Sequence, residues 1–122
     1  MNNKAIYQSK IKALGPLVET FKDEGMIILF GENAPDTLAD YCYSIEVNPV
    51  KEHIKTGQTF LLDGIPYKIT AVGDVAERNL ESLGHITLAF TGATQAPLPG
   101  TICVEKKEIP NLKAGSEIYI LE

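Results

Sequence analysis

The chain has 122 residues, of which 44% are hydrophobic and 22% charged, and these values predict one soluble globular domain over residues 1–122. Its 11 basic and 16 acidic residues give a net charge of −5, and an acidic chain without a basic stripe argues against a nucleic-acid partner. No apolar run approaches the roughly 20 residues that span a bilayer, so we expect no direct membrane insertion. Cys42 and Cys103 lack metal-type spacing, which favours two reduced thiols in a cytoplasmic protein.

Short strands dominate the first half of the chain. Alternating residues predict a half-exposed strand over residues 7–13. An apolar run between Gly25 and Gly31 predicts a strand that is buried on both faces at residues 26–30. Alternation returns at residues 43–47 and predicts another strand.

Two short helices interrupt this pattern. Residues 33–36, with a proline and an acid, are typical of a helix start, and this helix would direct Leu38 inward. A second helix is predicted to open at Asp74, whose carboxylate would form a capping box with Glu77. Gly84 is well placed to end this helix, because glycine readily adopts the left-handed conformation of a helix C-terminus.

The second half of the chain contains the clearest local signal. Asp63-Gly64 separates strand-like runs at 58–62 and 65–72, and this pair favours a tight hairpin. Further strands are predicted at 86–90, 101–105 and 117–121. Together these elements indicate a mainly all-β fold, a small closed or nearly closed antiparallel β-barrel with two short helices, and a β-sandwich is the alternative.

Histidine is the remaining candidate for chemistry. The chain has no glycine-rich phosphate loop, no His/Cys cluster with metal spacing and no nucleophile-elbow serine. A neutral imidazole is a good nucleophile near pH 7, and the chain has two histidines, His53 and His85. His53 lies in a polar segment, which predicts an exposed loop residue. His85 joins the second helix to a strand; the helix C-terminus there disfavours a phosphoryl dianion, and such a histidine is more often structural than functional.

Four segments carry a resemblance to a known family. They are "IYQSKI" at 6–11, "APDTLADYCY" at 34–43, "YKITAVGDVAERNLESLGHITLAF" at 67–90 and "PGTICV" at 99–104. With them the chain resembles, almost end to end, the glucitol/sorbitol-specific IIA component of the bacterial phosphoenolpyruvate-dependent sugar phosphotransferase system. The block at 71–90 is the most specific part, because its order of motifs is not a general fold signature.

The resemblance implies a small cytoplasmic β-barrel that relays phosphoryl groups. Such a component takes a phosphoryl group from HPr onto a histidine and passes it to the IIB part of the IIB/IIC sorbitol permease, which would bring it to the inner face of the membrane. The resemblance implies no cofactor and no metal. In enteric members the acceptor histidine follows the Tyr-Cys pair, in a stretch resembling His-Cys-His-Gly-Glu, whereas here Ile45 occupies its position.

Two interpretations follow from this departure. Either another histidine accepts the phosphoryl group, or the chain is a non-catalytic docking or regulatory barrel of the same system. His85 is the better acceptor candidate because its Leu-Gly-His block matches the family, and His53 is the alternative. Thr87, Gly84 and Asn79 would then support the phosphoryl group. A structural barrel with a small-molecule pocket is a third interpretation, which rests on fold analogy alone.

Overall fold

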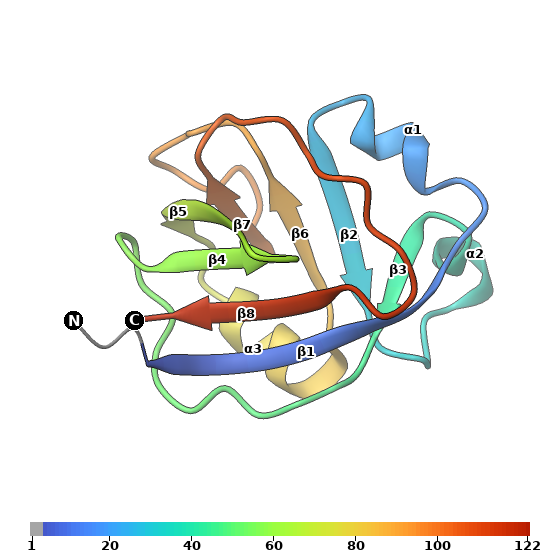
Figure 1. Cartoon of the computed structure of the whole chain (residues 1–122), viewed down its shortest axis with the longest axis horizontal. Helices are drawn as coiled ribbons and strands as arrows, with labels where there is room; N and C mark the ends of the chain where they lie inside the picture. The colour runs from blue at the N-terminus through green and yellow to red at the C-terminus, as the bar shows by residue number, and fades with distance from the viewer. Residues whose placement is uncertain (1–3) are drawn as a thin grey trace.

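The computed structural model describes residues 4–122, and its eight strands close into one barrel (Figure 1). Residues 1–3 of the expected domain lie outside the described part. The strands are β1 (Ala5–Leu14), β2 (Met26–Phe30), β3 (Cys42–Ile45), β4 (Thr59–Leu62), β5 (Ile65–Val72), β6 (Ile86–Ala89), β7 (Thr101–Val104) and β8 (Glu117–Leu121). The helices are α1 (Val18–Lys22), α2 (Asp36–Ala39) and α3 (Ala76–Leu83).

The strand order confirms the closed barrel and excludes the sandwich. Around the barrel the order is β1-β3-β2-β6-β7-β5-β4-β8. Six of the eight neighbouring pairs are antiparallel, while β2–β3 and β6–β7 are parallel. Alternate side chains point inward and are fully buried, as with Leu29, Ile45 and Ile86, so the barrel is filled by a continuous apolar core.

The predicted hairpin is confirmed. Asp63 and Gly64 both have positive φ, 49° and 81°, as a two-residue turn of type I′ requires. The Asp63 carboxylate also accepts hydrogen bonds from the hydroxyl of Ser116 at 2.6 Å and from the backbone N–H of Glu117 at 2.9 Å. The turn is therefore tied to the start of β8, which pairs with β4.

The helices differ from the prediction in three ways. There is a third helix, α1, which no sequence signal indicated. Leu38 was expected to point inward, but 39% of it is exposed, and α2 buries none of its residues. Four residues make barely one helical turn, so α2 lies on the surface and presents no continuous apolar face to the barrel.

The expected capping box of α3 is also wrong. The N-cap is Val75, which makes no side-chain cap. Glu77 instead turns away from the helix axis, and its Oε1 accepts the backbone N–H of Ile54 at 2.8 Å. The predicted end of the helix is confirmed, because Gly84 has a left-handed φ of 69°.

Both cysteines are free and buried, as the sequence indicated. The Cys42 thiol donates to the backbone oxygen of Leu38 at 3.1 Å, and burial raises the pKa of this thiol to about 11. None of the helices within residues 4–122 has the length and apolar composition that crossing a bilayer requires.

The passage from β5 into α3 depends on a close backbone approach at Gly73. Its N–H donates to the oxygen of Thr101 at 2.8 Å, and a Cβ on Gly73 would overlap the carbonyl oxygen of Pro99. The nearest atom to a Cβ on Gly100 would be 3.7 Å away, which is ordinary contact.

We therefore expect Gly73→Ala to lower the free energy of unfolding by about 2–3 kcal/mol, because the backbone has to move to admit a methyl group. The matched variant Gly100→Ala should stay within about 1 kcal/mol of the parent. Urea denaturation followed by circular dichroism measures both. Equal stability of the two variants would contradict this account of the β5–α3 passage.

Candidate functional site

The site begins at the junction of α3 and β6, where the backbone of His85 is fixed by a helix-ending motif. The N–H of Gly84 donates to the oxygen of Leu80 at 3.0 Å, and the N–H of His85 donates to the oxygen of Asn79 at 3.1 Å. The first of these bonds, with the left-handed φ of Gly84, is the αL motif that ends many helices. The backbone of His85, directly before β6, is therefore held in a defined position.

The end of β2 packs directly on this junction. The N–H of Gly31 donates to the oxygen of Leu83 at 2.8 Å, and a Cβ on Gly84 would lie 3.0 Å from the nitrogen of Gly31. A Cβ on Gly31 would lie 2.7 Å from the oxygen of Leu83, so neither glycine leaves room for a side chain. These N–H groups pair with backbone carbonyls at the C-terminus of α3. Fewer unpaired carbonyl oxygens therefore remain to give negative potential near His85.

The imidazole of His85 is held by two groups of β2. Nδ1 lies 3.2 Å from the backbone oxygen of Leu29, and the ring stacks on Phe30 with a centroid distance of 4.2 Å and an interplanar angle of 26°. A carbonyl oxygen only accepts hydrogen bonds, so Nδ1 carries the proton and the lone pair of the neutral ring is on Nε2. Within residues 4–122 no protein atom hydrogen-bonds Nε2. The half-buried ring thus offers one free nucleophilic nitrogen.

Two of the predicted supporting residues, Thr87 and Asn79, lie next to Gly100 in the loop before β7. Thr87 is two residues along β6 on the same outward face as His85, and its N–H donates to the oxygen of Gly100 at 3.1 Å. The side-chain nitrogen of Asn79 lies 3.7 Å from where a Cβ on Gly100 would be. Thr87 and Asn79 therefore both border Gly100 on the β7 side of β6, whereas the His85 ring contacts β2 on the other side.

Ile45 lies directly beneath the same junction. It is completely buried on the inner face of β3, and its Cγ1 lies 3.3 Å from where a Cβ on Gly84 would be. The two positions are far apart in the sequence, but β2 pairs with β3 on one side and with β6 on the other. The family's expected acceptor position and His85 are therefore neighbours in space.

His53 occupies a different environment. Its side chain is 85% exposed, and its Nδ1 lies 3.0 Å from Oε2 of Glu77 on α3. The ring is held by this single carboxylate, near the opposite end of α3 from Gly84. The structure thus places the two histidines at opposite ends of α3, and Gly84 directly precedes His85.

Sequence reasoning missed the two groups that orient the His85 ring. The Leu29 carbonyl and the Phe30 ring lie 55 or more positions earlier in the chain, and they meet His85 because Leu29 pairs with Ile86 in the β2–β6 register. A buried strand ending at Gly31 was predictable, but its partner strand was not.

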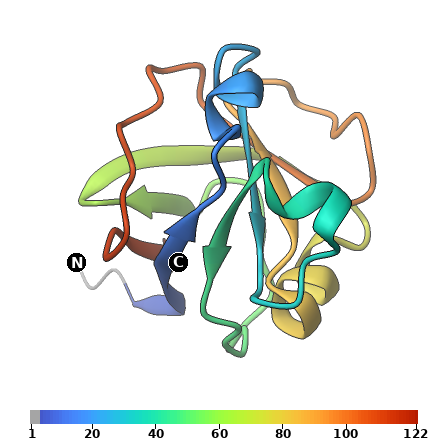
Figure 2. The same cartoon turned by 90° about the vertical axis from the view of Figure 1, so that its right-hand side faces the viewer.

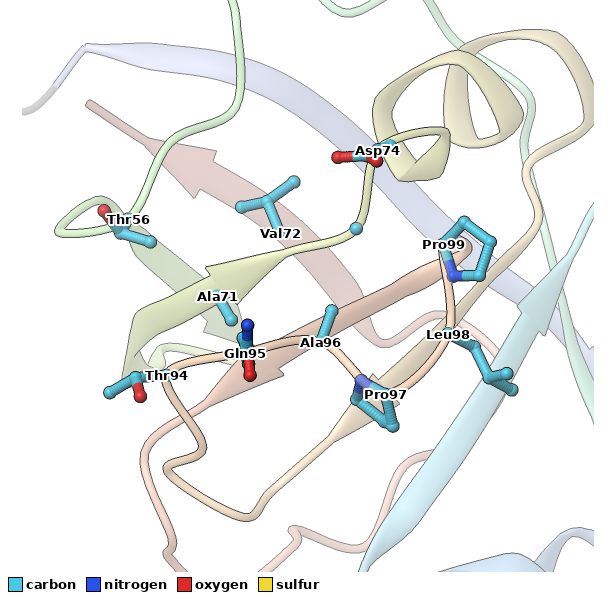
Figure 3. A pocket seen from close by; sticks show the side chains of 11 residues that line it. Thr56, Ala71, Val72, Asp74, Thr94, Gln95, Ala96, Pro97, Leu98 and Pro99 are labelled. Carbon is cyan, nitrogen blue, oxygen red and sulfur yellow. The ribbon is translucent and has the colours of Figure 1, made fainter.

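A surface pocket of about 520 Å³ lies on the outer side of β5, where the loop before β7 crosses it (Figure 3). The side chains around it include those of Thr56, Asp74, Thr94 and Gln95, together with small apolar and proline side chains. Its lining contains no histidine, so it offers no imidazole as a phosphoryl acceptor. Residues 4–122 also contain no cluster of three or more histidine, cysteine or acidic residues that could hold a metal ion.

The fold and the site define a small closed β-barrel with one oriented, half-buried imidazole at the junction of α3 and β6. Comparison with known families identifies the family: residues 6–119 match the one described as PTS system glucitol/sorbitol-specific IIA component. The chain is 38% identical over 111 residues to the PTS system glucitol/sorbitol-specific EIIA components of Shigella flexneri and Escherichia coli (strain K12). Each match covers 91% of this chain and 90% of the relative.

A solved structure agrees with these sequence matches. The crystal structure of the PTS system IIA component from Enterococcus faecalis V583 matches with a TM-score of 0.83 at 28% identity, over 95% of this chain and 100% of that one. The chain therefore belongs to the glucitol/sorbitol-specific IIA components of the sugar phosphotransferase system. As a member it works together with other components of that system, and the resemblance seen in the sequence is confirmed.

The ring geometry makes a direct prediction about the proton on His85. In the folded protein the neutral ring should be the Nδ1–H tautomer, because the Leu29 carbonyl accepts that proton. Long-range ¹H–¹⁵N correlation spectra of the ring distinguish the two tautomers, and the same protein in urea is the control, since unfolding removes the carbonyl. An Nε2–H tautomer in the folded protein would refute this geometry.

Proposed function

We propose that this chain is a phosphoryl relay in which Nε2 of His85 accepts a phosphoryl group from HPr and passes it to the IIB part of a sorbitol (glucitol) permease. Membership of the IIA family supports the relay, and the permease selects the polyol. One observation carries the choice of residue: the Leu29 carbonyl holds the proton on Nδ1 and leaves Nε2 free on a ring stacked against Phe30.

The chemistry needs no cofactor in this chain. The lone pair of Nε2 attacks the phosphorus of phospho-HPr, the phosphorus–nitrogen bond to the donor imidazole breaks, and its electron pair returns to that imidazole. The proton on Nδ1 stays in its hydrogen bond to Leu29 and stabilises the phosphorylated ring. In the second transfer the nucleophile of IIB attacks the phosphorus in line, the phosphorus–nitrogen bond to His85 breaks, and its electron pair returns to Nε2. In-line transfer of this kind is accelerated mainly by positioning and by electrostatic stabilisation.

Three neighbours support the phosphoryl group in this proposal. In it, the Thr87 hydroxyl, on the same outward face as His85, and the Asn79 amide, which borders Gly100, donate hydrogen bonds to the phosphoryl oxygens. Gly84 contributes the left-handed turn and the close approach to Gly31 that hold His85 in place. The occupied carbonyls at the end of α3 reduce the repulsion that a helix C-terminus exerts on a dianion.

A second candidate function is favoured by Ile45. A fully buried isoleucine at the family's acceptor position cannot carry a phosphoryl group. On this alternative the chain is a docking or regulatory barrel that binds other components of the system without being phosphorylated. His53, whose exposed ring faces Glu77, is the alternative acceptor if the chain is phosphorylated elsewhere.

We expect incubation with phosphoenolpyruvate, enzyme I and HPr to add one phosphoryl group to the parent chain, located on the peptide that contains His85. His85→Ala should abolish this labelling, and the matched variant His53→Ala should be labelled like the parent. Intact and tryptic mass spectrometry at neutral to alkaline pH measures both, and urea denaturation checks that each variant is folded.

The outcomes separate the three possibilities. Labelling that is lost in His53→Ala and kept in His85→Ala would move the acceptor to His53. No labelling of the parent, with a control IIA component labelled by the same donor proteins, would favour the docking or regulatory barrel.

A further inference from the structure

A groove of about 200 Å³ lies between α2 and the strands beneath it. Its lining includes Leu14, Phe30, Ala34, Ala39 and Cys42, and is therefore mostly apolar. Figure 2 shows this face of the molecule, with α2 and β3 toward the viewer. A dry cavity of about 150 Å³ in another protein holds benzene, so this volume accommodates one leucine-, methionine- or phenylalanine-sized side chain.

Leu14, which lines the groove, is one of several exposed apolar side chains on the segments around it. Five of the seven exposed large apolar side chains among residues 4–122 belong to segments that meet here: Leu14, Leu17, Leu38, Val47 and Leu83. Their exposed fractions run from 39% for Leu38 to 49% for Leu83. An apolar concentration of this kind on a small domain marks a surface that another molecule covers.

Hydrogen bonds and close contacts link these segments around the groove. The N–H of Leu17 donates to the oxygen of Asp40 at 2.8 Å, just after α2. On the other side, Gly31 lines the groove and lies against the side chain of Val47. The N–H of Gly31 donates a hydrogen bond to the backbone oxygen of Leu83. The segments that carry these side chains are thus connected around the groove.

The same surface is acidic. From residue 31 to residue 50 the chain has four acidic residues and no lysine or arginine, within a total net charge of −5. The four are Glu32, Asp36, Asp40 and Glu46. Lys12 pairs with Glu32, while Asp36 and Asp40 at the two ends of α2 are exposed and have no basic side chain within salt-bridge distance among the described residues. Charge complementarity therefore selects a basic partner surface.

The groove is continuous with the candidate site through Phe30. This side chain lines the groove and also stacks on the imidazole of His85. A protein that fills the groove therefore contacts the same phenylalanine ring that stacks on His85. Of the two partners in the proposed relay, the donor diffuses freely, and encounter between free proteins is the step that opposite charges accelerate.

We propose that this groove, with its acidic rim, is the docking site for the phosphoryl donor HPr, which inserts one large apolar side chain from a basic surface. The identity of the donor rests on the proposed function, whereas the docking itself does not require His85 to be the acceptor. Binding of unphosphorylated HPr, measured by calorimetry, therefore tests the groove separately from the relay.

Three variants of the intact chain test the site. Ala34→Leu fills the groove and should weaken HPr binding at least about 10-fold, as expected for a blocked central pocket, without lowering the free energy of unfolding. Asp36→Lys should weaken binding about 5-fold or more and reduce its dependence on salt. The matched control Asp74→Lys also reverses an exposed acid near a helix start, but away from the groove, and should change binding less than about 2-fold.

Each result decides the proposal. Weaker HPr binding by Ala34→Leu and Asp36→Lys but not by Asp74→Lys supports it, whether or not His85 is phosphorylated. Unchanged HPr binding by Ala34→Leu, or no measurable binding by the parent chain, overturns it. Loss of IIB binding with HPr binding unchanged would assign the groove to the acceptor protein and overturn the choice of the donor.

Discussion

The approach of the end of β2 to the end of α3 is the constraint on which the rest of the site depends. Gly31 and Gly84 make this approach possible, because a side chain on either would collide with the other segment. It brings the Leu29 carbonyl and the Phe30 ring to His85. One crossing of two elements therefore orients the imidazole, buries the strand that supports it and opens the groove beside it.

The neighbouring positions of Ile45 and His85 give the departure from the family a structural meaning. Position 45 lies beneath the junction and His85 lies on it, so both are near the same part of the surface. On the proposed function, a nucleophile at the α3–β6 junction replaces one on the neighbouring part of β3. The buried isoleucine then contributes to the core, where its burial stabilises the barrel by roughly 1.5–3 kcal/mol.

Local features of the fold were predictable and long-range ones were not. The Asp63-Gly64 turn and the end of α3 at Gly84 follow from the backbone freedom of glycine, which acts within a few residues. The failed capping box has the opposite cause, because Glu77 bonds to Ile54, a residue on another segment. For the site, sequence reasoning selected His85 but could not supply Leu29 and Phe30, since the pairing of β2 with β6 is set by closure of the whole barrel.

The most direct test of the central claim is to find which nitrogen carries the phosphoryl group. Phosphorus–nitrogen couplings in ¹⁵N-labelled, HPr-phosphorylated protein distinguish the two ring nitrogens of each histidine. The account predicts phosphorus on Nε2 of His85, with the proton still on Nδ1. Phosphorus on Nδ1 of His85, or on either nitrogen of His53, would contradict it.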